Sequence, residues 1–222
     1  MKVLGVLSRK GGVGKTTLAI HMAVLADQAG LRTLVVDLDP QRSAAAWWRA
    51  RAADTPALVE TDAASLPDIL EAAAEDSVDI TVVDARPSVE ADAELVAALA
   101  DLVVVPTRPA IFDLRAILGT LDIVKGGKHR SLIVLNACPP PRGTAEAALV
   151  TDARHALAAF GVPVAPIAIV NRSAFPTAAV DGLTACEAEP DSKAAREMRA
   201  LWRSIEKELS NGKAITAKRA GA

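Results

Sequence analysis

One short stretch near the start of the chain restricts its fold more than any other feature: Ser8-Arg9-Lys10-Gly11-Gly12-Val13-Gly14-Lys15-Thr16-Thr17. An apolar run, residues 3–7, precedes it, and a helical pattern, residues 18–29, follows it. A phosphate-binding loop requires this order of strand, glycine-rich loop and helix. Glycines leave backbone N–H groups free to surround a phosphate, and the N-terminus of the helix adds a partial positive charge. The stretch therefore predicts an anion site beyond the first strand.

Two side chains of this loop have predicted contacts. Lys15 would lie against the β- and γ-phosphates of a nucleotide, and the hydroxyl of Thr16 would bind Mg²⁺. The usual pattern, G-x-x-x-x-G-K-[ST], places glycine at position 9, but this chain has Arg9 there and a second lysine, Lys10, inside the loop. A glycine turn that only joined a strand to a helix would not explain two lysines at this spacing.

The composition indicates a soluble, cytoplasmic protein with one large domain. Of the 222 residues, 51% are hydrophobic, which is enough for a full core. Charged Arg9 and Lys10 interrupt the first apolar stretch, so we expect neither a signal peptide nor a membrane span. The net charge of −2 means that nucleic-acid binding would need a local patch. Cys138 and Cys186 form no ligand pattern, and we interpret them as reduced thiols.

Apolar runs and helical patterns alternate along the chain. Strands are predicted at residues 2–7, 32–36, 57–61, 79–83, 102–105 and 132–135, with Pro106 ending the fifth. Helices are predicted at residues 16–29, 66–75, 89–100, 114–124 and 144–160, together with one that Ser43 caps. Alternating helices and almost wholly apolar strands predict an α/β fold. Its doubly wound, mostly parallel β-sheet would carry helices on both faces.

The polar residues with predicted chemistry follow these strands at their carboxyl ends. They are Lys10 and Lys15 after the first strand, Asp37 and Asp39 at the second, and Asp84 and Asn136 after two later ones. In doubly wound sheets the ligand binds beyond this edge. The agreement among these positions is stronger evidence for a site than any single motif.

The loop residues Lys10-Gly11-Gly12-Val13-Gly14-Lys15-Thr16-Thr17 resemble the deviant Walker A motif of the ParA/MinD ATPases. The stretch Asp37-Leu38-Asp39-Pro40-Gln41 resembles the next motif of that family. The resemblance implies a P-loop NTPase fold, a Rossmann-like three-layer sandwich, in a single ATPase domain over residues 1–209. Residues 210–222 would form a basic, disordered tail. The chain is most similar to the small, ParF-like ParA proteins of plasmid and chromosome partition.

The resemblance also implies ATP and Mg²⁺ as cofactors and an ATP-dependent homodimer. Lys10 would reach across the interface to the ATP of the partner and act there as an arginine finger does, an effect of about 10³ to 10⁵ in rate in other NTPases. The alternative for Lys10 is a solvated loop lysine. The nucleotide contacts that the family implies are Lys10, Gly11, Gly12, Val13, Gly14, Lys15, Thr16, Thr17, Arg108 and Asn136.

Three aspartates complete the predicted site. By resemblance, Asp39 orients the attacking water and is catalytic together with Lys10 and Lys15. Thr16, Asp37 and Asp84 would hold the magnesium ion, the two aspartates through water. The alternative for Asp37 and Asp39 is capping of a turn or helix. After Asp84 this chain departs from the family, with Ala85-Arg86-Pro87 where Thr-Pro-Pro is usual.

Two further positions have open alternatives. Asn136 is a candidate to read the adenine edge, or it is a turn residue at a strand end. On the last helical pattern five cations lie opposite the apolar face: Lys193, Arg196, Arg199, Arg203 and Lys207. They would follow a DNA backbone, or they would form a solvated face paired with Glu197, Glu206 and Glu208. The resemblance favours weak, non-specific DNA binding, with a dissociation constant of about 10⁻⁴ to 10⁻⁶ M that depends on salt.

The predicted function is that of a DNA-partition ATPase. Its ATP sandwich dimer would bind DNA on the nucleoid until a ParB-like or equivalent centromere-binding partner stimulates hydrolysis and releases it. The alternative is a MinD-like ATPase that positions a protein assembly at a membrane or cell pole. Residues 210–222 contain one bulky apolar residue, Ile215, so we expect no stable membrane association. The cysteines disfavour an iron–sulfur carrier, and Lys10 disfavours a small-molecule kinase.

Overall fold

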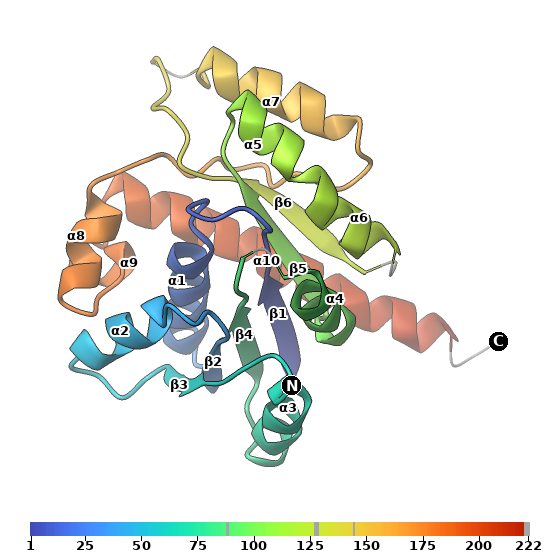
Figure 1. The fold of residues 1–222 in the computed structure, drawn as a ribbon. Helices are drawn as coiled ribbons and strands as arrows, with labels where there is room; N and C mark the ends of the chain where they lie inside the picture. The colour runs from blue at the N-terminus through green and yellow to red at the C-terminus, as the bar shows by residue number, and fades with distance from the viewer. Residues whose placement is uncertain (88, 127–128, 144, 220–222) are drawn as a thin grey trace.

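The computed structural model describes residues 1–87, 89–126, 129–143 and 145–219, and its centre is one β-sheet (Figure 1). The six strands lie in the order β3-β2-β4-β1-β5-β6, and every neighbouring pair is parallel. The strands are β1 (Lys2–Val6), β2 (Thr33–Asp37), β3 (Ala57–Glu60), β4 (Ile80–Asp84), β5 (Leu102–Thr107) and β6 (Ser131–Leu135). The predicted doubly wound sheet is therefore confirmed, and it is parallel throughout.

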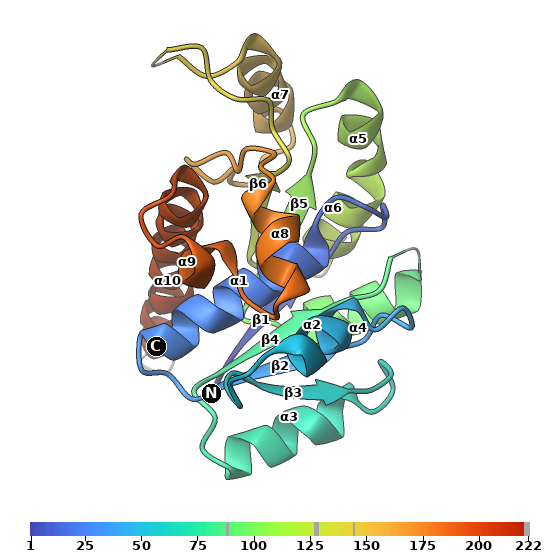
Figure 2. The same cartoon turned by 90° about the vertical axis from the view of Figure 1, so that its left-hand side faces the viewer.

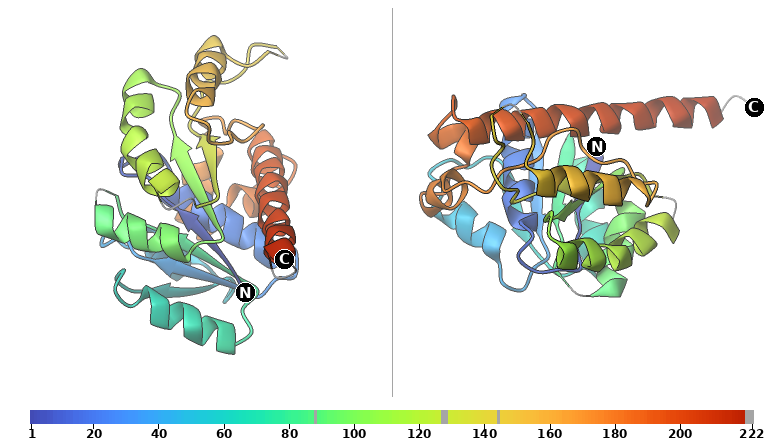
Figure 3. Two further views of the ribbon diagram at one scale, coloured as in Figure 1. Left: turned by 90° about the vertical axis from the view of Figure 1, so that its right-hand side faces the viewer. Right: turned by 90° about the horizontal axis from the view of Figure 1, so that it is seen from above.

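Helices cover both faces of this sheet (Figures 1 and 3). One apolar core joins it to α1 (Lys15–Gln28), α2 (Ser43–Ala50), α9 (Ala185–Ala188) and α10 (Lys193–Arg219). The other core joins it to α3 (Leu66–Glu75), α4 (Glu90–Leu99), α6 (Leu118–Gly126) and α7 (Ala148–Ala158). The remaining helices, α5 (Ile111–Ala116) and α8 (Ala174–Val180), lie near the carboxyl edge of the sheet. This is the predicted three-layer sandwich.

Helix α1 is buried on almost all sides. Every residue from Leu18 to Ala26 is buried, because the helix lies between the sheet and the pair formed by α9 and α10 (Figure 2). A helix enclosed in this way cannot rotate without disturbing both layers. Its N-terminus, and the glycine-rich loop that leads into it, therefore have a fixed place at the edge of the sheet.

Pro106 does not end β5 as predicted. The strand continues to Thr107, and Pro106 lies opposite Val134 of β6. The carbonyl of Val104 accepts the N–H of Leu7 from the β1 side, and residues two apart in a strand point the same way. Pro106, two residues after Val104, therefore also faces the β1 side. Strand β1 has ended before this position, so the missing N–H of Pro106 removes no ladder hydrogen bond.

Three helix predictions also need correction. The helix predicted at residues 114–124 is two helices, α5 and α6, and the one predicted at 144–160 begins only at Ala148. Ser43 does not cap α2, because the N-cap residue is Arg42, in a left-handed conformation. A carboxylate oxygen of Asp37 accepts the N–H of Ala45 at 3.0 Å instead, and so performs the capping.

The boundary of the predicted tail falls inside α10. That helix begins at Lys193 and continues to Arg219, past the boundary placed between residues 209 and 210. Residues 220–222 lie outside the described part of the chain. That residues 210–222 form a tail separate from the ATPase domain stays a prediction.

Helix α2 is fastened to α9 by polar contacts. The indole of Trp47 donates to the carbonyl of Leu183 at 3.1 Å. Arg51 donates to both carboxylate oxygens of Glu187, at 2.6 and 3.1 Å, and to the carbonyl of Gly182. Glu187 in turn closes a capping box with Thr184 at the start of α9. Helix α2, which follows the motif at residues 37–41, is thus held against α9, the helix that packs on α1.

The close approach of Gly182 to α2 gives a test of this packing. Gly182 has a φ of 66°, and a Cβ there would lie 2.3 Å from the backbone nitrogen of Arg51. At Gly161 φ is 67°, and no described atom lies within 4 Å of such a Cβ. Gly161→Ala should therefore cost only the left-handed strain, about 1 kcal/mol. Gly182→Ala should lower the free energy of unfolding by about 2 kcal/mol more in urea denaturation. Equal losses would contradict the packing.

Candidate nucleotide-binding site

The glycine-rich loop has a conformation that its sequence requires. Gly12 and Gly14 have φ values of 71° and 91°, which residues with a Cβ rarely adopt. Gly14 is the N-cap residue of α1, and a Cβ there would lie 2.2 Å from the side-chain nitrogen of Asn136. Gly11 and Gly12 are exposed while Val13 is buried. The loop therefore offers its backbone to solvent at the N-terminus of a buried helix, as an anion site needs.

Lys15 and Thr16 begin α1 beside a buried carboxylate. The side chain of Lys15 is buried, and this burial lowers its pKa. The negative charges of Asp84 and Asp39 act in the opposite direction and raise the pKa, but burial has the larger effect. The hydroxyl of Thr16 donates to Asp84 at 2.6 Å. Burial raises the pKa of Asp84 to about 7, and its second oxygen has no hydrogen-bond partner among the described residues. A buried carboxylate oxygen left in this way suits a cation.

Asp37 and Asp84 stand side by side at the edge of the sheet. They are register partners on β2 and β4, and both are fully buried. Burial raises the pKa of Asp37 as well. Two carboxylates and the hydroxyl of Thr16 are hard oxygen ligands of the type that Mg²⁺ prefers, so the residues present fit that ion. The sequence prediction that brought Thr16, Asp37 and Asp84 together is consistent with this geometry.

The oxygens of Asp37 already have partners within the chain. One accepts the N–H of Asp39 and the other the N–H of Ala45, each at 3.0 Å. Asp37 therefore performs the capping that sequence reasoning kept as its alternative, and a magnesium contact through water would add to it. Asp39 is partly exposed, and its carboxylate accepts the N–H of Gln41 at 3.0 Å. That Asp39 orients a water molecule stays a prediction.

The first half of the loop is fastened to the opposite layer of helices. The ammonium of Lys10 lies 2.9 Å from a carboxylate oxygen of Asp113 on α5. The N–H of Arg9 donates to the hydroxyl of Thr120 on α6, and its guanidinium lies 3.7 Å from Glu90 of α4. No periodicity or motif indicated these contacts, because each joins the loop to a single side chain on a helix distant in sequence.

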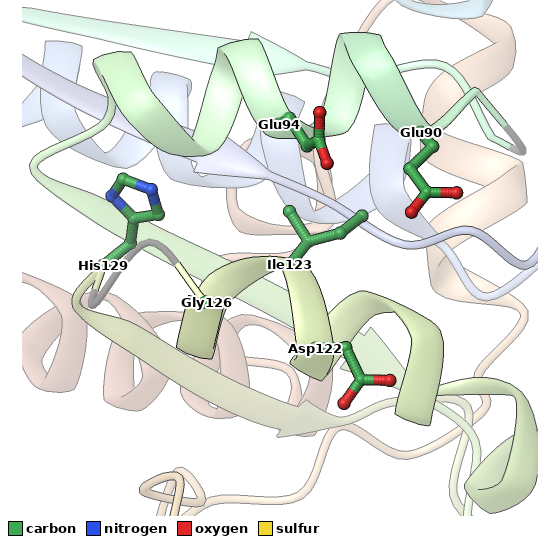
Figure 4. Close-up of a pocket in the computed structure, with 6 residues that line it drawn as sticks. All are labelled: Glu90, Glu94, Asp122, Ile123, Gly126 and His129. Atoms are coloured by element: carbon green, nitrogen blue, oxygen red, sulfur yellow. The ribbon is translucent and has the colours of Figure 1, made fainter.

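A pocket of about 410 Å³ opens between α4 and α6, next to Glu90 (Figure 4). Its lining residues are Glu90, Glu94, Asp122, Ile123, Gly126 and His129. Among the residues that the structure describes, no three or more His, Cys, Asp or Glu side chains form a group that could hold a metal ion. The pocket therefore gives no sign of a second metal site.

A second pocket, of about 250 Å³, lies against the loop on its other side. Gly12, Thr17, Arg108 and Asn136 contribute to its wall. Sequence reasoning missed four further residues there, two just before α8 and two within it: Asn171, Arg172, Phe175 and Pro176. Arg108 donates to the carbonyl of Gly12, and Asn136, which is buried, donates to the carbonyl of Val13 at 2.6 Å. Both side chains hold the loop from this side, and their predicted contacts with the nucleotide stay predictions.

His21 connects the loop helix to α9. The ring Nδ1 donates to the carbonyl of Thr17 at 2.7 Å, and Nε2 accepts the N–H of Ala185 at 3.0 Å. The ring also packs edge-to-face on Phe175. Burial lowers the pKa of His21 to about 4, so the neutral ring is the form that makes both contacts. No motif in the sequence indicated these two hydrogen bonds.

The cationic stripe on α10 has no ion pair with a carboxylate among the described residues. Lys193, Arg196, Arg203 and Lys207 are exposed and Arg199 is half-buried. Glu197 pairs with Arg172 at 2.5 Å and Glu208 with Arg130 at 2.8 Å. Two of the three acids that would have neutralised the stripe thus face elsewhere, and none of its five cations has an ion pair with a described residue.

A parallel sheet with a glycine-rich loop after β1, a buried lysine and two buried carboxylates defines a P-loop nucleotide-binding protein. Residues 4–185 match the family described as CobQ/CobB/MinD/ParA nucleotide binding domain, and the chain belongs to that family. It is thus an ATPase, with ATP and Mg²⁺ as its cofactors. No described helix has the length and hydropathy to cross a membrane.

Two relatives of the chain have names that describe different roles. The chain is 36% identical over 214 residues to "Maintenance of carboxysome distribution protein A" of Gloeobacter kilaueensis, which covers 94% of each chain. It is 31% identical over 164 residues to the chromosome-partitioning ATPase Soj of Thermus thermophilus, 60% of this chain and 66% of that protein.

Solved structures share the fold at low identity. Apo McdA of Cyanothece has a TM-score of 0.77 at 17% identity, over 94% of this chain and 99% of the other. The cell-division ATPase MinD of Pyrococcus furiosus has a TM-score of 0.74 at 20% identity, over 93% and 98%. These likenesses confirm the P-loop NTPase architecture.

The buried histidine predicts a pH dependence of stability. The folded pKa of His21, about 4, is below its ordinary value of 6.5. The unfolded chain therefore binds the proton more readily, so the contribution of His21 is complete above pH 6.5 and is lost as the pH falls toward 4. In His21→Gln the amide does not titrate. The gap in unfolding free energy between wild type and variant should shrink by about 3 kcal/mol between pH 7 and pH 4.

Urea denaturation at each pH measures this gap, and other titrations common to both proteins cancel in the difference. His155→Gln, on an exposed position of α7, is the control and should follow the wild-type profile. A gap that stays constant from pH 7 to pH 4 would contradict the neutral, doubly hydrogen-bonded ring.

Proposed function

We propose that the chain is an ATPase that positions a protein assembly in the cell. The observation that carries this proposal is the 36% identity to a carboxysome distribution protein over 94% of both chains. The matched length is nearly the whole of each protein, so it takes in more than the phosphate loop that all relatives share. The comparisons thus favour the alternative that sequence analysis kept open over its first reading, partition of DNA.

The site supports an ATP-dependent dimerisation cycle. The backbone of the loop and Lys15 would bind the phosphates, while Thr16, Asp84 and, through water, Asp37 would hold Mg²⁺. When bound, that ion neutralises charge on the β- and γ-phosphate oxygens. Asp39, at the partly exposed mouth, would orient the attacking water. Lys10 of the second subunit would stabilise the charge that develops on the transferred phosphoryl group.

The cationic stripe supports DNA as the surface on which the protein acts. Five cations that form no ion pair with a described carboxylate make a local positive face on a chain whose net charge is −2. Each phosphate contact adds affinity that falls with salt, and a dimer would carry two such stripes. ATP would thus control DNA binding by controlling dimerisation. The partner that stimulates hydrolysis would then be a protein of the assembly, in place of the ParB-like partner that sequence analysis predicted.

Partition of a chromosome or plasmid is the second candidate. The observation in its favour is the 31% identity to a chromosome-partitioning ATPase. The two candidates share the site and the stripe and differ only in what the ATPase moves. The absence of stable membrane association and the localisation on the nucleoid stay predictions for both.

The cargo distinguishes the two candidates. In host cells that lack this chain, or that carry Lys15→Ala, we expect a labelled protein assembly to collect in one or two clusters because nothing distributes it. Cells without DNA should stay as rare as in the parent strain. Fluorescence microscopy of the assembly and of the chromosome in the same cells measures both. Frequent DNA-free cells with normally spaced assemblies would replace the first candidate by the second.

DNA binding can be tested separately from cargo. Reversing the charges of Arg196, Arg199 and Arg203 to Glu should abolish ATP-dependent retention on DNA, because repulsion replaces three phosphate contacts. ATP turnover should be unchanged. The control variant reverses three exposed cations away from the stripe, Arg32, Lys125 and Arg142, and so has the same net charge. Retention measured against salt should separate the two variants, and equal retention would remove the stripe from the proposal.

A further inference from the structure

Arg86 lies where this chain departs from its family after Asp84, and the proposed ATPase cycle does not use it. Its backbone is fixed beside the phosphate loop. The preceding residue, Ala85, donates its N–H to the carbonyl of Val6, the last residue of β1, at 3.3 Å. The carbonyl of Asp84 accepts the N–H of Leu38, just past β2, at 3.0 Å. The side chain of Arg86 therefore begins between the phosphate loop and the motif that follows β2.

The guanidinium of Arg86 has a counter-ion in the first turn of α4. Its Nε lies 2.5 Å from a carboxylate oxygen of Asp92, with 35% of the arginine side chain and 18% of the aspartate side chain exposed. That nitrogen is nevertheless buried without a hydrogen-bond partner among the described residues, so the two groups attract each other without an aligned N–H. A partly exposed ion pair stabilises a fold little, and a donor that is not aligned is available to a better acceptor.

A bound nucleotide would offer such an acceptor close by. Arg86 lies two residues after Asp84, so their Cα atoms are at most about 7.6 Å apart. Asp84 is the carboxylate proposed to hold Mg²⁺, an ion that bridges the β- and γ-phosphate oxygens when bound. The γ-phosphate would therefore lie at the end of the sheet from which Arg86 begins. Rotation about the three methylenes of the arginine can turn its guanidinium from α4 toward that phosphate without moving the backbone.

We propose that Arg86 contacts the γ-phosphate of ATP bound to its own subunit and exchanges Asp92 for this phosphate. A phosphate accepts two parallel N–H bonds from a guanidinium, each strengthened by charge. ADP has no γ-phosphate, so Arg86 would stay with Asp92 in that complex. Arg86 thereby lets the chain distinguish ATP from ADP before a second subunit arrives. This inference rests on the proposed nucleotide site.

Arg86→Gln is the direct test, because it removes the charge and keeps a polar side chain. Affinities for ADP and for a slowly hydrolysed ATP analogue, both with Mg²⁺, are measured by competition with a fluorescent nucleotide. The protein concentration is one at which wild type is monomeric. The variant should bind the analogue about ten- to hundredfold more weakly than wild type, the range for a hydrogen bond to a charged group, and ADP equally well. Equal losses for both nucleotides, or no loss for the analogue, would overturn the proposal.

Asp92→Asn separates phosphate binding from a purely structural role of the ion pair. The substitution removes the counter-ion that competes with the γ-phosphate for Arg86. The variant should therefore bind the analogue about two- to fivefold more tightly than wild type, the range for a partly exposed pair, with its affinity for ADP unchanged. If the pair served only to fix the start of α4, Asp92→Asn and Arg86→Gln would change analogue binding in the same direction, and the exchange would be rejected.

Arg130→Gln is the matched control. Arg130 lies just before β6, at the amino edge of the sheet, and pairs with Glu208 at 2.8 Å with 28% of its side chain exposed. This variant loses the same charge from a paired arginine and should bind both nucleotides as wild type does. An analogue loss as large as that of Arg86→Gln would be an effect of net charge and would reject the contact. If wild type bound neither nucleotide, the proposed site would fail and the contact with it, whereas an unchanged ratio of affinities in Arg86→Gln rejects the contact alone.

Discussion

Two buried carboxylates, Asp37 and Asp84, set the conditions for the rest of the site. They are register partners on adjacent strands, so their charges would repel each other in a medium of low dielectric. Hydrogen-bond donors of the chain stabilise these carboxylates: the hydroxyl of Thr16 and the backbone N–H groups of Asp39 and Ala45. One oxygen of Asp84 has no hydrogen-bond partner among the described residues. Positive charge at this edge of the sheet would therefore stabilise the two carboxylates, and a magnesium nucleotide would supply it.

Side chains of the same subunit hold the loop beside these carboxylates in shape. Arg108 and Asn136 bind its carbonyls from one side, and Arg9 and Lys10 bind helices on the other. A loop that is already ordered loses less conformational freedom when a phosphate arrives. The bracing differs between its two sides, however. Asn136 is buried against the glycines, whereas Lys10 is tied to a short helix with one buried residue.

The sequence could predict what local patterns determine. Apolar strands, the glycines of the loop and the polar residues at strand ends identified the sheet and most of the site, since each depends on a few neighbouring residues. Contacts between distant single side chains left no such pattern. The contacts of Lys10 with Asp113 and of Arg9 with Thr120, and the two hydrogen bonds of His21, were therefore not predicted. Helices α8 and α9 were also missed, because they have only seven and four residues, too few for a period to emerge.

The smallest helix has a consequence for any dimer. Helix α9 is joined to α1 by the hydrogen bond that the N–H of Ala185 donates to His21, and to the end of α2 by the hydrogen bond from Arg51 to Glu187. It also packs on α10. Hydrogen bonds fix direction as well as distance, so the angle of α10 to the phosphate loop is set within each subunit. Two subunits related by a two-fold axis would then present their stripes at one separation and one angle. A duplex would meet a rigid pair of surfaces, whose joint affinity depends on their geometry and not on the length of a flexible linker.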